Sequence, residues 1–327
     1  MRKYPQTRLR RNRDEKWLRD LLKEHYLTAN DLILPIFIHD KQGTEPIKTL
    51  PEVKRLDLEY AKQQIAQAVQ LGIKAVALFP VVESELKTAD AQEALNPNNL
   101  MARTLRALKK EFADEIGLIA DIALDPYNSL GHDGLVQEDK ILNDETIKIL
   151  EQQAILMAES GADIVAPSDM MDGRIGCIRT MLDQHNFQSV KILSYAVKFA
   201  SNFYGPFRDA VGSKGSLGKA SKESYQLPFS TSFDCAAELE MDIAEGADLF
   251  MIKPALPYLD ILKTLKDKYN VPFFAYQVSG EYAALKAAEK SGALDYQQTQ
   301  LESLIACKRA GASAIFCYDA LEIAEIL

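Results

Sequence analysis

The sequence predicts an α/β protein built as a (β/α)8 TIM barrel with an extended N-terminal arm. Eight apolar segments rich in β-branched residues recur along the chain, and segments with the period of amphipathic helices lie between them. Near-continuous hydrophobicity is typical of parallel strands that are covered on both faces. An open doubly wound sheet is the alternative fold, but no G-x-G-x-x-G turn follows the first apolar segment.

The expected strands are the apolar runs themselves, which cover residues 31–38, 75–81, 117–124, 163–168, 191–197, 248–254, 271–278 and 313–320. Helical periodicity is clear in the segments 58–71, 144–159, 234–245 and 257–268. Helical patterns end at Gly72, Gly161, Gly246 and Gly311, and glycine is the usual residue just after a helix. We expect a helix to end at each of these glycines and the next strand to follow.

The chain divides into an N-terminal arm, residues 1–30, and a catalytic barrel domain, residues 31–327. Residues 2–19 concentrate arginine and lysine on an otherwise acidic protein. Pro5 and the lack of an apolar face before Trp17 predict an extended arm rather than an amphipathic membrane anchor. We expect the arm to contact acidic surface on another subunit.

Composition excludes several classes of protein. The net charge of -9 argues against a nucleic-acid-binding surface over most of the chain. No apolar run approaches the roughly 18 to 20 residues that a membrane span needs, and no signal peptide opens the chain. The 4 cysteines include no C-x-x-C pair, which predicts reduced thiols and disfavours a thiolate zinc site. We expect a cytosolic protein with no nucleic-acid or membrane partner.

Two lysines stand at the ends of expected strands, Lys198 after the fifth and Lys253 within the sixth. Neighbouring strands are about 4.8 Å apart, so the two amines can approach each other. An ordinary lysine is only about a thousandth neutral at pH 7, but burial and a second cation lower its pKa. A neutral amine can form a Schiff base with a ketone. The alternative is that each lysine is structural and pairs with a buried carboxylate.

A long polar connection, residues 205–233, follows Lys198 and is interpreted as an active-site lid. In a barrel the active site lies at the C-terminal ends of the strands, where this segment begins. Arg208 is a candidate clamp for a substrate carboxylate, with Lys219 and Lys222 in the same segment. Solvated lysines that bind nothing are the alternative for the last two.

Further polar residues fall at the same mouth of the expected barrel. Ser279 begins a helix after the seventh strand, where backbone N–H groups and a hydroxyl can hold an anion, and Tyr318 adds a phenol. Asp121, Asp125 and Asp133 lie near the end of the third strand and in the connection after it. Those carboxylates could bind a hard cation or hold a substrate amine and move its proton. They could also serve only the backbone of a turn.

Long ordered segments of the chain resemble the porphobilinogen synthase family, also called 5-aminolevulinate dehydratase. They are RLRRNR at 8–13, LILPIFI at 32–38, ALFPVVE at 77–83, APSDMMDGRI at 166–175, SYAVKFASNFYGPFRDA at 194–210, MIKPALPYLDI at 251–261 and YQVSGEY at 276–282. The resemblance implies condensation of two 5-aminolevulinate molecules to porphobilinogen with loss of two waters. That reaction is an early step of tetrapyrrole and haem biosynthesis.

The resemblance also implies roles for individual residues. Lys253, in MIKPA, matches the lysine that forms the Schiff base with the first substrate, and Lys198, in YAVKFAS, matches the second lysine. Ser279 and Tyr318 match residues that hold one substrate carboxylate. Arg208 and Lys222, with Gln226 nearby, match the residues that hold the other substrate carboxylate. Many members have an arginine where Lys222 stands, so a bidentate contact is reduced here to a point charge.

The resemblance implies a magnesium-responsive enzyme without a catalytic zinc. Zinc-dependent members carry three cysteines where this chain has Ala123, Asp125 and Asp133, so soft thiolate ligation is missing. Glu238 falls at the position of a glutamate that binds a regulatory Mg²⁺ ion outside the active site. The family commonly assembles as an octamer in which the N-terminal arm embraces a neighbouring subunit.

Two other interpretations of the sequence remain open. A class I aldolase or a dihydrodipicolinate-like lyase also uses a barrel lysine, but only one would be essential. A barrel that has lost catalysis would serve only as a binding or scaffold subunit. An assay for pyrrole formation from 5-aminolevulinate separates all three.

Overall fold

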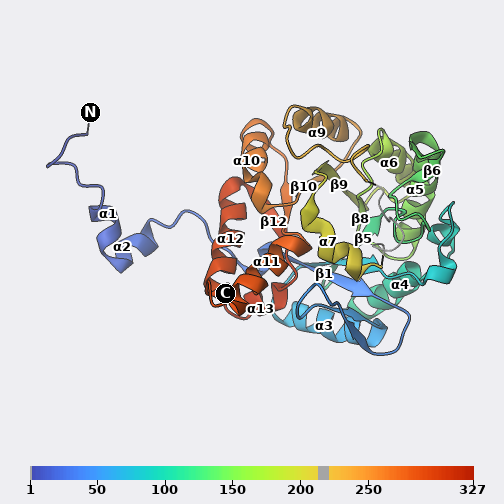
Figure 1. Ribbon diagram of the computed structural model, residues 1–327, viewed down its shortest axis with the longest axis horizontal. Coiled ribbons are helices and arrows are strands. Elements are labelled where there is room, and N and C mark those ends of the chain that lie inside the picture. The colour runs from blue at the N-terminus through green and yellow to red at the C-terminus, as the bar shows by residue number, and fades with distance from the viewer. Residues whose placement is uncertain (1, 213–220) are drawn as a thin grey trace.

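The central strands of the protein run in parallel and close on themselves (Figure 1). The computed structural model describes residues 2–212 and 221–327. In sheet order the barrel strands are β1 (Leu32–Ile38), β4 (Ala75–Pro80), β5 (Gly117–Ile122), β8 (Ile164–Pro167), β9 (Lys191–Lys198), β10 (Leu249–Lys253), β11 (Phe273–Tyr276) and β12 (Ala312–Phe316). The ring closes because β12 pairs with β1, which confirms the predicted (β/α)8 barrel.

Helices surround the ring and return the chain from strand to strand (Figure 1). They are α3 (Leu58–Gln70), α4 (Leu100–Phe112), α5 (Asn143–Glu159), α6 (Arg174–Gln184), α9 (Asp234–Ala244), α10 (Leu259–Lys268), α11 (Ser279–Lys290), α12 (Tyr296–Ala310) and α13 (Ala320–Ala324). The helices expected from periodicity are confirmed, with ends within two residues of the prediction. Gly72, Gly161, Gly246 and Gly311 have φ angles of +86°, +102°, +97° and +118°, the left-handed conformation that ends a helix.

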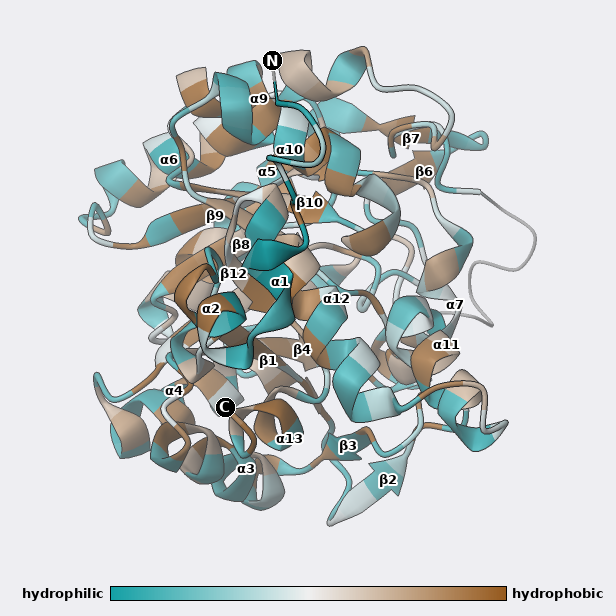
Figure 2. Cartoon of the chain, turned by 90° about the vertical axis from the view of Figure 1, so that its left-hand side faces the viewer, coloured by the Kyte–Doolittle hydropathy of each residue, from teal (hydrophilic) through white to brown (hydrophobic). Residues whose placement is uncertain are grey.

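The first strand shows why the barrel strands are hydrophobic throughout. All residues of β1 are buried. Ile33 and Phe37 belong to a cluster inside the barrel that includes Tyr276, whereas Leu34 packs with helix residues such as Leu105. Because one face meets the barrel interior and the other meets the helices, neither face favours polar residues. The surrounding helices carry alternating hydrophilic and hydrophobic bands (Figure 2).

The N-terminal arm leaves the barrel and carries two short helices, α1 (Arg11–Asp14) and α2 (Lys16–Leu21) (Figures 1 and 2). The sequence predicts an extended arm, and this detail is wrong for residues 11–21. Local contacts support the helix, since Lys16 and Asp20 lie one turn apart and form an ion pair of 2.6 Å. Trp17 is 65% exposed. Contact between the arm and another subunit stays a prediction.

Two short hairpins were not expected from the sequence. β2 (Thr44–Pro46) and β3 (Lys54–Leu56) are antiparallel, and β3 extends the sheet beside β1. β6 (Leu135–Gln137) and β7 (Lys140–Leu142) form a second pair in the connection after β5. Strands of three residues are too short to produce a readable alternation. Within the described ranges, no helix combines the length and hydrophobicity needed to cross a membrane.

Candidate active site

Lys198 and Lys253 end two neighbouring strands at the C-terminal mouth of the barrel. They are the last residues of β9 and β10 and pair with each other in the register of these parallel strands. Both residues are 6% exposed. The structure therefore brings two buried amines together, as the sequence predicts.

The two amines have different surroundings. Lys198 Nζ donates to the Ser168 carbonyl and lies 3.6 Å from Asp133 Oδ1. In residues 2–212 and 221–327, no carboxylate lies within ion-pair distance of Lys253 Nζ. Its neighbours are aromatic: the ring centroids of Tyr276, Tyr195, Phe207 and Tyr204 lie at 4.3, 4.9, 5.1 and 5.6 Å. Aromatic faces are weak substitutes for water or a carboxylate around an ammonium group.

Burial lowers the pKa of Lys253 to about 7, and the positive charge of Lys198 acts in the same direction. The negative charges of Asp121, Asp125 and Asp133 oppose this shift without cancelling it. A lysine with a pKa near 7 is about half neutral at neutral pH, instead of about a thousandth. A neutral amine in this position can act as a nucleophile.

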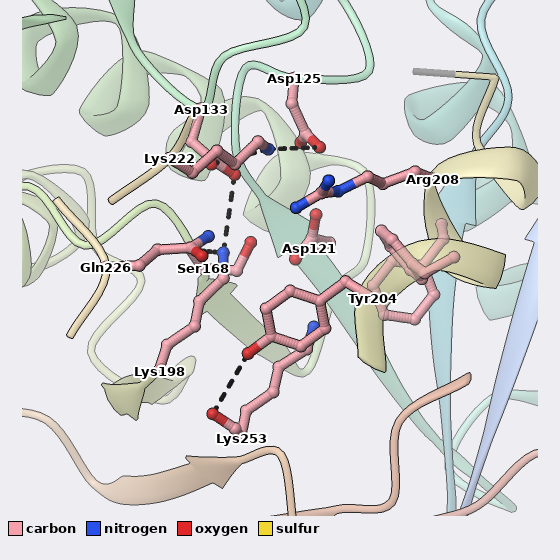
Figure 3. Close-up of a pocket in the computed structure, with 12 residues that line it drawn as sticks. Asp121, Asp125, Asp133, Ser168, Lys198, Tyr204, Arg208, Lys222, Gln226 and Lys253 are labelled. Atoms are coloured by element: carbon pink, nitrogen blue, oxygen red, sulfur yellow. Dashed lines mark hydrogen bonds and ion pairs between the residues drawn. The ribbon is translucent and has the colours of Figure 1, made fainter. Parts of the chain in front are cut away.

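A cavity opens beside the two lysines (Figure 3). The cavity is lined by both lysines and by further residues that the sequence singles out, namely Asp121, Asp125, Asp133, Arg208, Lys222 and Gln226. Residues from several barrel strands and from the connection after β9 thus meet in one site.

The carboxylates of this cavity differ in protonation. Burial raises the pKa of Asp121 to about 7, and Asp125 adds to this, although Lys253 and Lys198 oppose it. Burial would also raise the pKa of Asp133, but Lys198 and Lys222 outweigh it and bring the value to about 2. Asp133 is thus a fixed anion at neutral pH. Asp121 can take up or release a proton, which suits a general acid and base.

Lys222 lies within an ion cluster on one wall of the cavity (Figure 3). Its Nζ is 2.8 Å from Asp133 and 3.2 Å from Asp125. Burial would lower the pKa of Lys222, but these two carboxylates raise it. Arg208, on α7 (Gly205–Ala210), has no carboxylate within ion-pair distance in the described part of the chain, and Gln226 Oε1 is buried there without a hydrogen bond. Arg208 and Gln226 are therefore the groups most open to a ligand.

Ser279 and Tyr318 lie beside the cavity but do not line it. Ser279 Oγ accepts a hydrogen bond of 2.9 Å from the Phe207 N–H, while the Phe207 side chain lines the cavity. The Tyr318 hydroxyl is 3.1 Å from that of Tyr276. Neither of these two predicted ligands therefore lines the cavity together with Lys253 in this structure. Lys219, named in the same connection, lies outside the described residues.

Gly280 permits this connection to lie against α11. A Cβ atom at this position would stand 2.4 Å from the carbonyl oxygen of Phe203. Such a contact forces the backbone apart, so only glycine fits the observed arrangement.

Glu238 lies on α9, away from the cavity. Burial raises its pKa, and Asp242, Asp172 and Asp234 act in the same direction, against Arg174. The Mg²⁺ ion expected at Glu238 stays a prediction. The described residues contain no group of three His, Cys, Asp or Glu side chains able to hold a metal. An ion at Glu238 would therefore keep most of its water ligands.

Known proteins resemble this chain over nearly its full length. The sequence profile of the family described as delta-aminolevulinic acid dehydratase matches residues 6–326. The chain belongs to the delta-aminolevulinic acid dehydratase family. The dehydratase of Bradyrhizobium diazoefficiens is 48% identical over 321 residues, which cover 98% of this chain and 90% of the relative. That of Rhodobacter capsulatus is 43% identical over 325 residues, with 99% and 97% covered.

A solved structure of the same family has the same fold as this chain. It is the delta-aminolevulinic acid dehydratase (porphobilinogen synthase) of Toxoplasma gondii in complex with the reaction product porphobilinogen. The TM-score is 0.96 at 46% sequence identity, with 98% of this chain and 91% of the other covered. At this similarity the strand ends that carry Lys198 and Lys253 belong to a shared scaffold.

Sequence reasoning missed the aromatic residues that surround the amine in this dehydratase-family protein. Tyr195, Tyr204, Phe207 and Tyr276 enclose Lys253 Nζ. A weak signal was present, because Tyr204 and Phe207 follow Lys198 closely in FASNFYGPFRD. Aromatic residues in buried strands are ordinarily core residues, so the pattern alone does not assign them to a site.

We expect Lys253 to react with ketones in a pH-dependent way. Reduction by borohydride of the imine with 4-oxopentanoate, measured by mass spectrometry of the Lys253 peptide, should rise with pH through about 7, because the neutral amine attacks. Lys198→Met removes a positive charge and should move the midpoint to higher pH. Asp121→Asn removes a negative charge and should move it to lower pH. Shifts in the reverse directions would refute this account of the pKa of Lys253.

Gly280→Ala should displace the connection after β9 and reduce kcat/KM by about a hundredfold, since misplacement by about 1 Å has effects of that size. Gly205→Ala is the matched control, because a Cβ atom there meets no atom within 4 Å. Steady-state kinetics and thermal unfolding of both variants test this. Equal activity in the two variants would show that the contact between Gly280 and Phe203 has no functional importance.

Proposed function

We propose that the protein is a porphobilinogen synthase, a hydro-lyase that condenses two 5-aminolevulinate molecules to porphobilinogen with loss of two waters. Membership of the dehydratase family supports this activity. The observation that carries it is the pair of buried lysines, of which Lys253 has a pKa of about 7 and no ion-pair partner in the described residues. The product is a precursor of tetrapyrroles such as haem.

Lys253 is assigned the first covalent step. Its neutral amine adds to the ketone carbon of one 5-aminolevulinate, and the resulting carbinolamine loses water to give an imine. Lys198 is assigned the second amine, which can capture the ketone of the other substrate in the same way. The ammonium form of Lys198 also lowers the pKa of Lys253, so each lysine supports the reactivity of the site.

Asp121 is assigned the movement of protons. Burial raises its pKa to about 7, so this carboxyl group can take up and release a proton at neutral pH. Loss of water from the carbinolamine needs an acid, and formation of carbon-carbon and carbon-nitrogen bonds needs a base. A single carboxyl group that titrates near 7 can serve both purposes. We assign Asp125 and Asp133 the role of orienting a substrate amine and the side chain of Lys222.

The two substrate carboxylates are assigned to two sets of residues. Arg208, Lys222 and Gln226 face one end of the cavity. Lys222 already contacts two carboxylates, so Arg208 must provide most of the attraction for this substrate. Ser279 and Tyr318 are assigned the other carboxylate. The Ser279 hydroxyl accepts from the Phe207 N–H and makes only a long contact of 3.4 Å as a donor, so its proton can turn toward a substrate.

We place the enzyme in the magnesium-responsive branch of its family, without a catalytic zinc. Two of the positions that carry zinc-binding cysteines elsewhere are Asp125 and Asp133, and both contact Lys222. Glu238 is assigned a regulatory Mg²⁺ ion, which would neutralise the acidic side chains around it. A homo-octamer with the N-terminal arm between subunits, a lid formed by residues 205–233 and a cytosolic location complete the proposal.

Lys253→Ala should abolish porphobilinogen formation and borohydride trapping of 5-aminolevulinate, because the other lysines among the described cavity residues, Lys198 and Lys222, are paired with carboxylates. Lys198→Ala should also abolish turnover but should still permit trapping on Lys253. The control is Lys263→Ala, since the Lys263 side chain is 55% exposed on α10. Colorimetric detection of the pyrrole and peptide mapping give both readouts. Full turnover without Lys198 would instead favour an aldolase-like enzyme with one essential lysine.

Removal of divalent metal should lower the activity by about fivefold or more, the usual range of allosteric coupling, and Mg²⁺ but not Zn²⁺ should restore it. Glu238→Gln should lose this response. Glu240→Gln is the control, because Glu240 lies on the same helix but accepts a hydrogen bond from Tyr269. Light scattering should show a change of assembly size with Mg²⁺. Identical rates and sizes in EDTA would contradict a regulatory metal.

A further inference from the structure

Glu281 is a buried carboxylate to which the proposed chemistry gives no task. It lies in the first turn of α11 and is 4% exposed. Its oxygens accept hydrogen bonds from three backbone N–H groups: those of Val278 at 2.6 Å, Leu256 at 2.7 Å and Ala255 at 3.3 Å. The carboxylate thus joins the connection after β10 to the beginning of α11.

The bonds to Ala255 and Leu256 fix the backbone just after Lys253. Pro254 has no N–H group, so the first two N–H groups beyond Lys253 both donate to Glu281. The carbonyl of Lys253 itself accepts from the Phe199 N–H at 2.9 Å and from the Tyr204 hydroxyl at 3.2 Å. The main chain that carries the reactive amine is therefore held on both sides.

The bond to Val278 fixes the backbone just before Ser279. Val278 directly precedes Ser279, which is assigned a substrate carboxylate. One buried side chain thus holds both the strand end that carries the amine and the helix start that carries the hydroxyl. In 5-aminolevulinate, two methylene groups separate the ketone carbon from the carboxylate. A fixed distance between amine and hydroxyl would select that length.

We propose that Glu281 is a positioning residue that sets the distance between Lys253 and Ser279, and thereby selects keto acids with two methylene groups between carbonyl and carboxylate. This inference rests on the proposed function, because it takes Ser279 as a carboxylate ligand. Glu281 acts through the backbone and touches no substrate. Its role is therefore specificity of the first imine, not chemistry.

A helix cap explains only part of this arrangement. A glutamate at the third helical position commonly reaches back to the N–H group before the helix, which accounts for the bond to Val278. It does not account for two further bonds to a different connection. Burial raises the pKa of Glu281 to about 7. The folded protein therefore keeps this carboxyl group buried although its ionised form would be more stable in water. A solvated glutamate could cap the helix equally well.

The test compares two keto acids that differ by one methylene, 4-oxopentanoate and 5-oxohexanoate. Borohydride trapping on Lys253 is measured by peptide mass spectrometry over a range of concentrations of each acid. The wild-type protein should prefer 4-oxopentanoate by about tenfold or more, the usual effect of one methylene. In Glu281→Gln, whose amide cannot accept all three N–H groups, the preference should fall to about threefold or less. Glu289→Gln, an exposed residue of the same helix, should behave as wild type.

A general loosening of the fold would lower trapping of both acids equally and leave their ratio unchanged, which would overturn the inference. Absence of a preference in the wild-type protein would overturn it as well. If Glu281→Gln does not fold, Glu281→Asp keeps the charge on a shorter side chain and must give a lower preference than wild type. An unchanged preference in folded Glu281→Asp would then refute the role. The proposed function is tested independently of this inference: it is refuted if the wild-type protein forms no porphobilinogen.

Discussion

The site depends on the amine of Lys253, which has no counter-ion among the residues that the structure describes. A buried lysine ordinarily pairs with a carboxylate, and carboxylates are present in this cavity. Two of them are engaged elsewhere: Asp133 contacts both Lys198 and Lys222, and Asp125 contacts Lys222. Lys253 is left among aromatic rings, so it loses its proton near neutral pH. The distribution of charges around it is therefore as important as its own burial.

The ion pairs around Lys222 explain why many residues at the C-terminal mouth of the barrel are polar, although the amine of Lys253 is buried. Lys222 satisfies acidic side chains that would otherwise stabilise the ammonium form of Lys253. The register of β9 and β10 keeps Lys198 beside Lys253 as a repelling charge. Substitution of Lys222 would thus affect two properties at once, the attraction for a substrate carboxylate and the pKa of the nucleophile. The two effects can be separated only by measuring both.

The sequence predicted the barrel because its signals are local and repeated. Apolar strands, amphipathic helices and glycines at helix ends each constrain a few neighbouring residues, and the observed φ angles agree with the expected helix ends. The short hairpin of β2 and β3 gave no such signal. The arm was expected to be extended, but contacts one helical turn apart, as between Lys16 and Asp20, were enough for short helices.

Site residues could be predicted from the sequence where the residue type is unusual for its position. They could not be predicted where the role depends on hydrogen-bond partners that are distant in the chain. Lysines at strand ends stand out in a sequence, so Lys198 and Lys253 were identified from position alone. The bond between Ser279 and the Phe207 N–H joins residues far apart in the chain. The same holds for Lys222 with Asp125 and for Glu281 with Leu256. Such pairs follow from the closed barrel, and no local pattern encodes them.

The aromatic faces around Lys253 also affect the adduct that forms once the ketone is captured. An ammonium ion is small and strongly hydrated, so this enclosure disfavours it. A protonated iminium ion spreads its charge over carbon and nitrogen and holds water less tightly, and π faces attract such diffuse cations. The same four rings that keep water away from the free amine therefore stabilise the positive charge of the bound adduct. The aromatic enclosure thus favours the iminium form of the Lys253 nitrogen over its ammonium form, and the iminium is the form that continues the reaction.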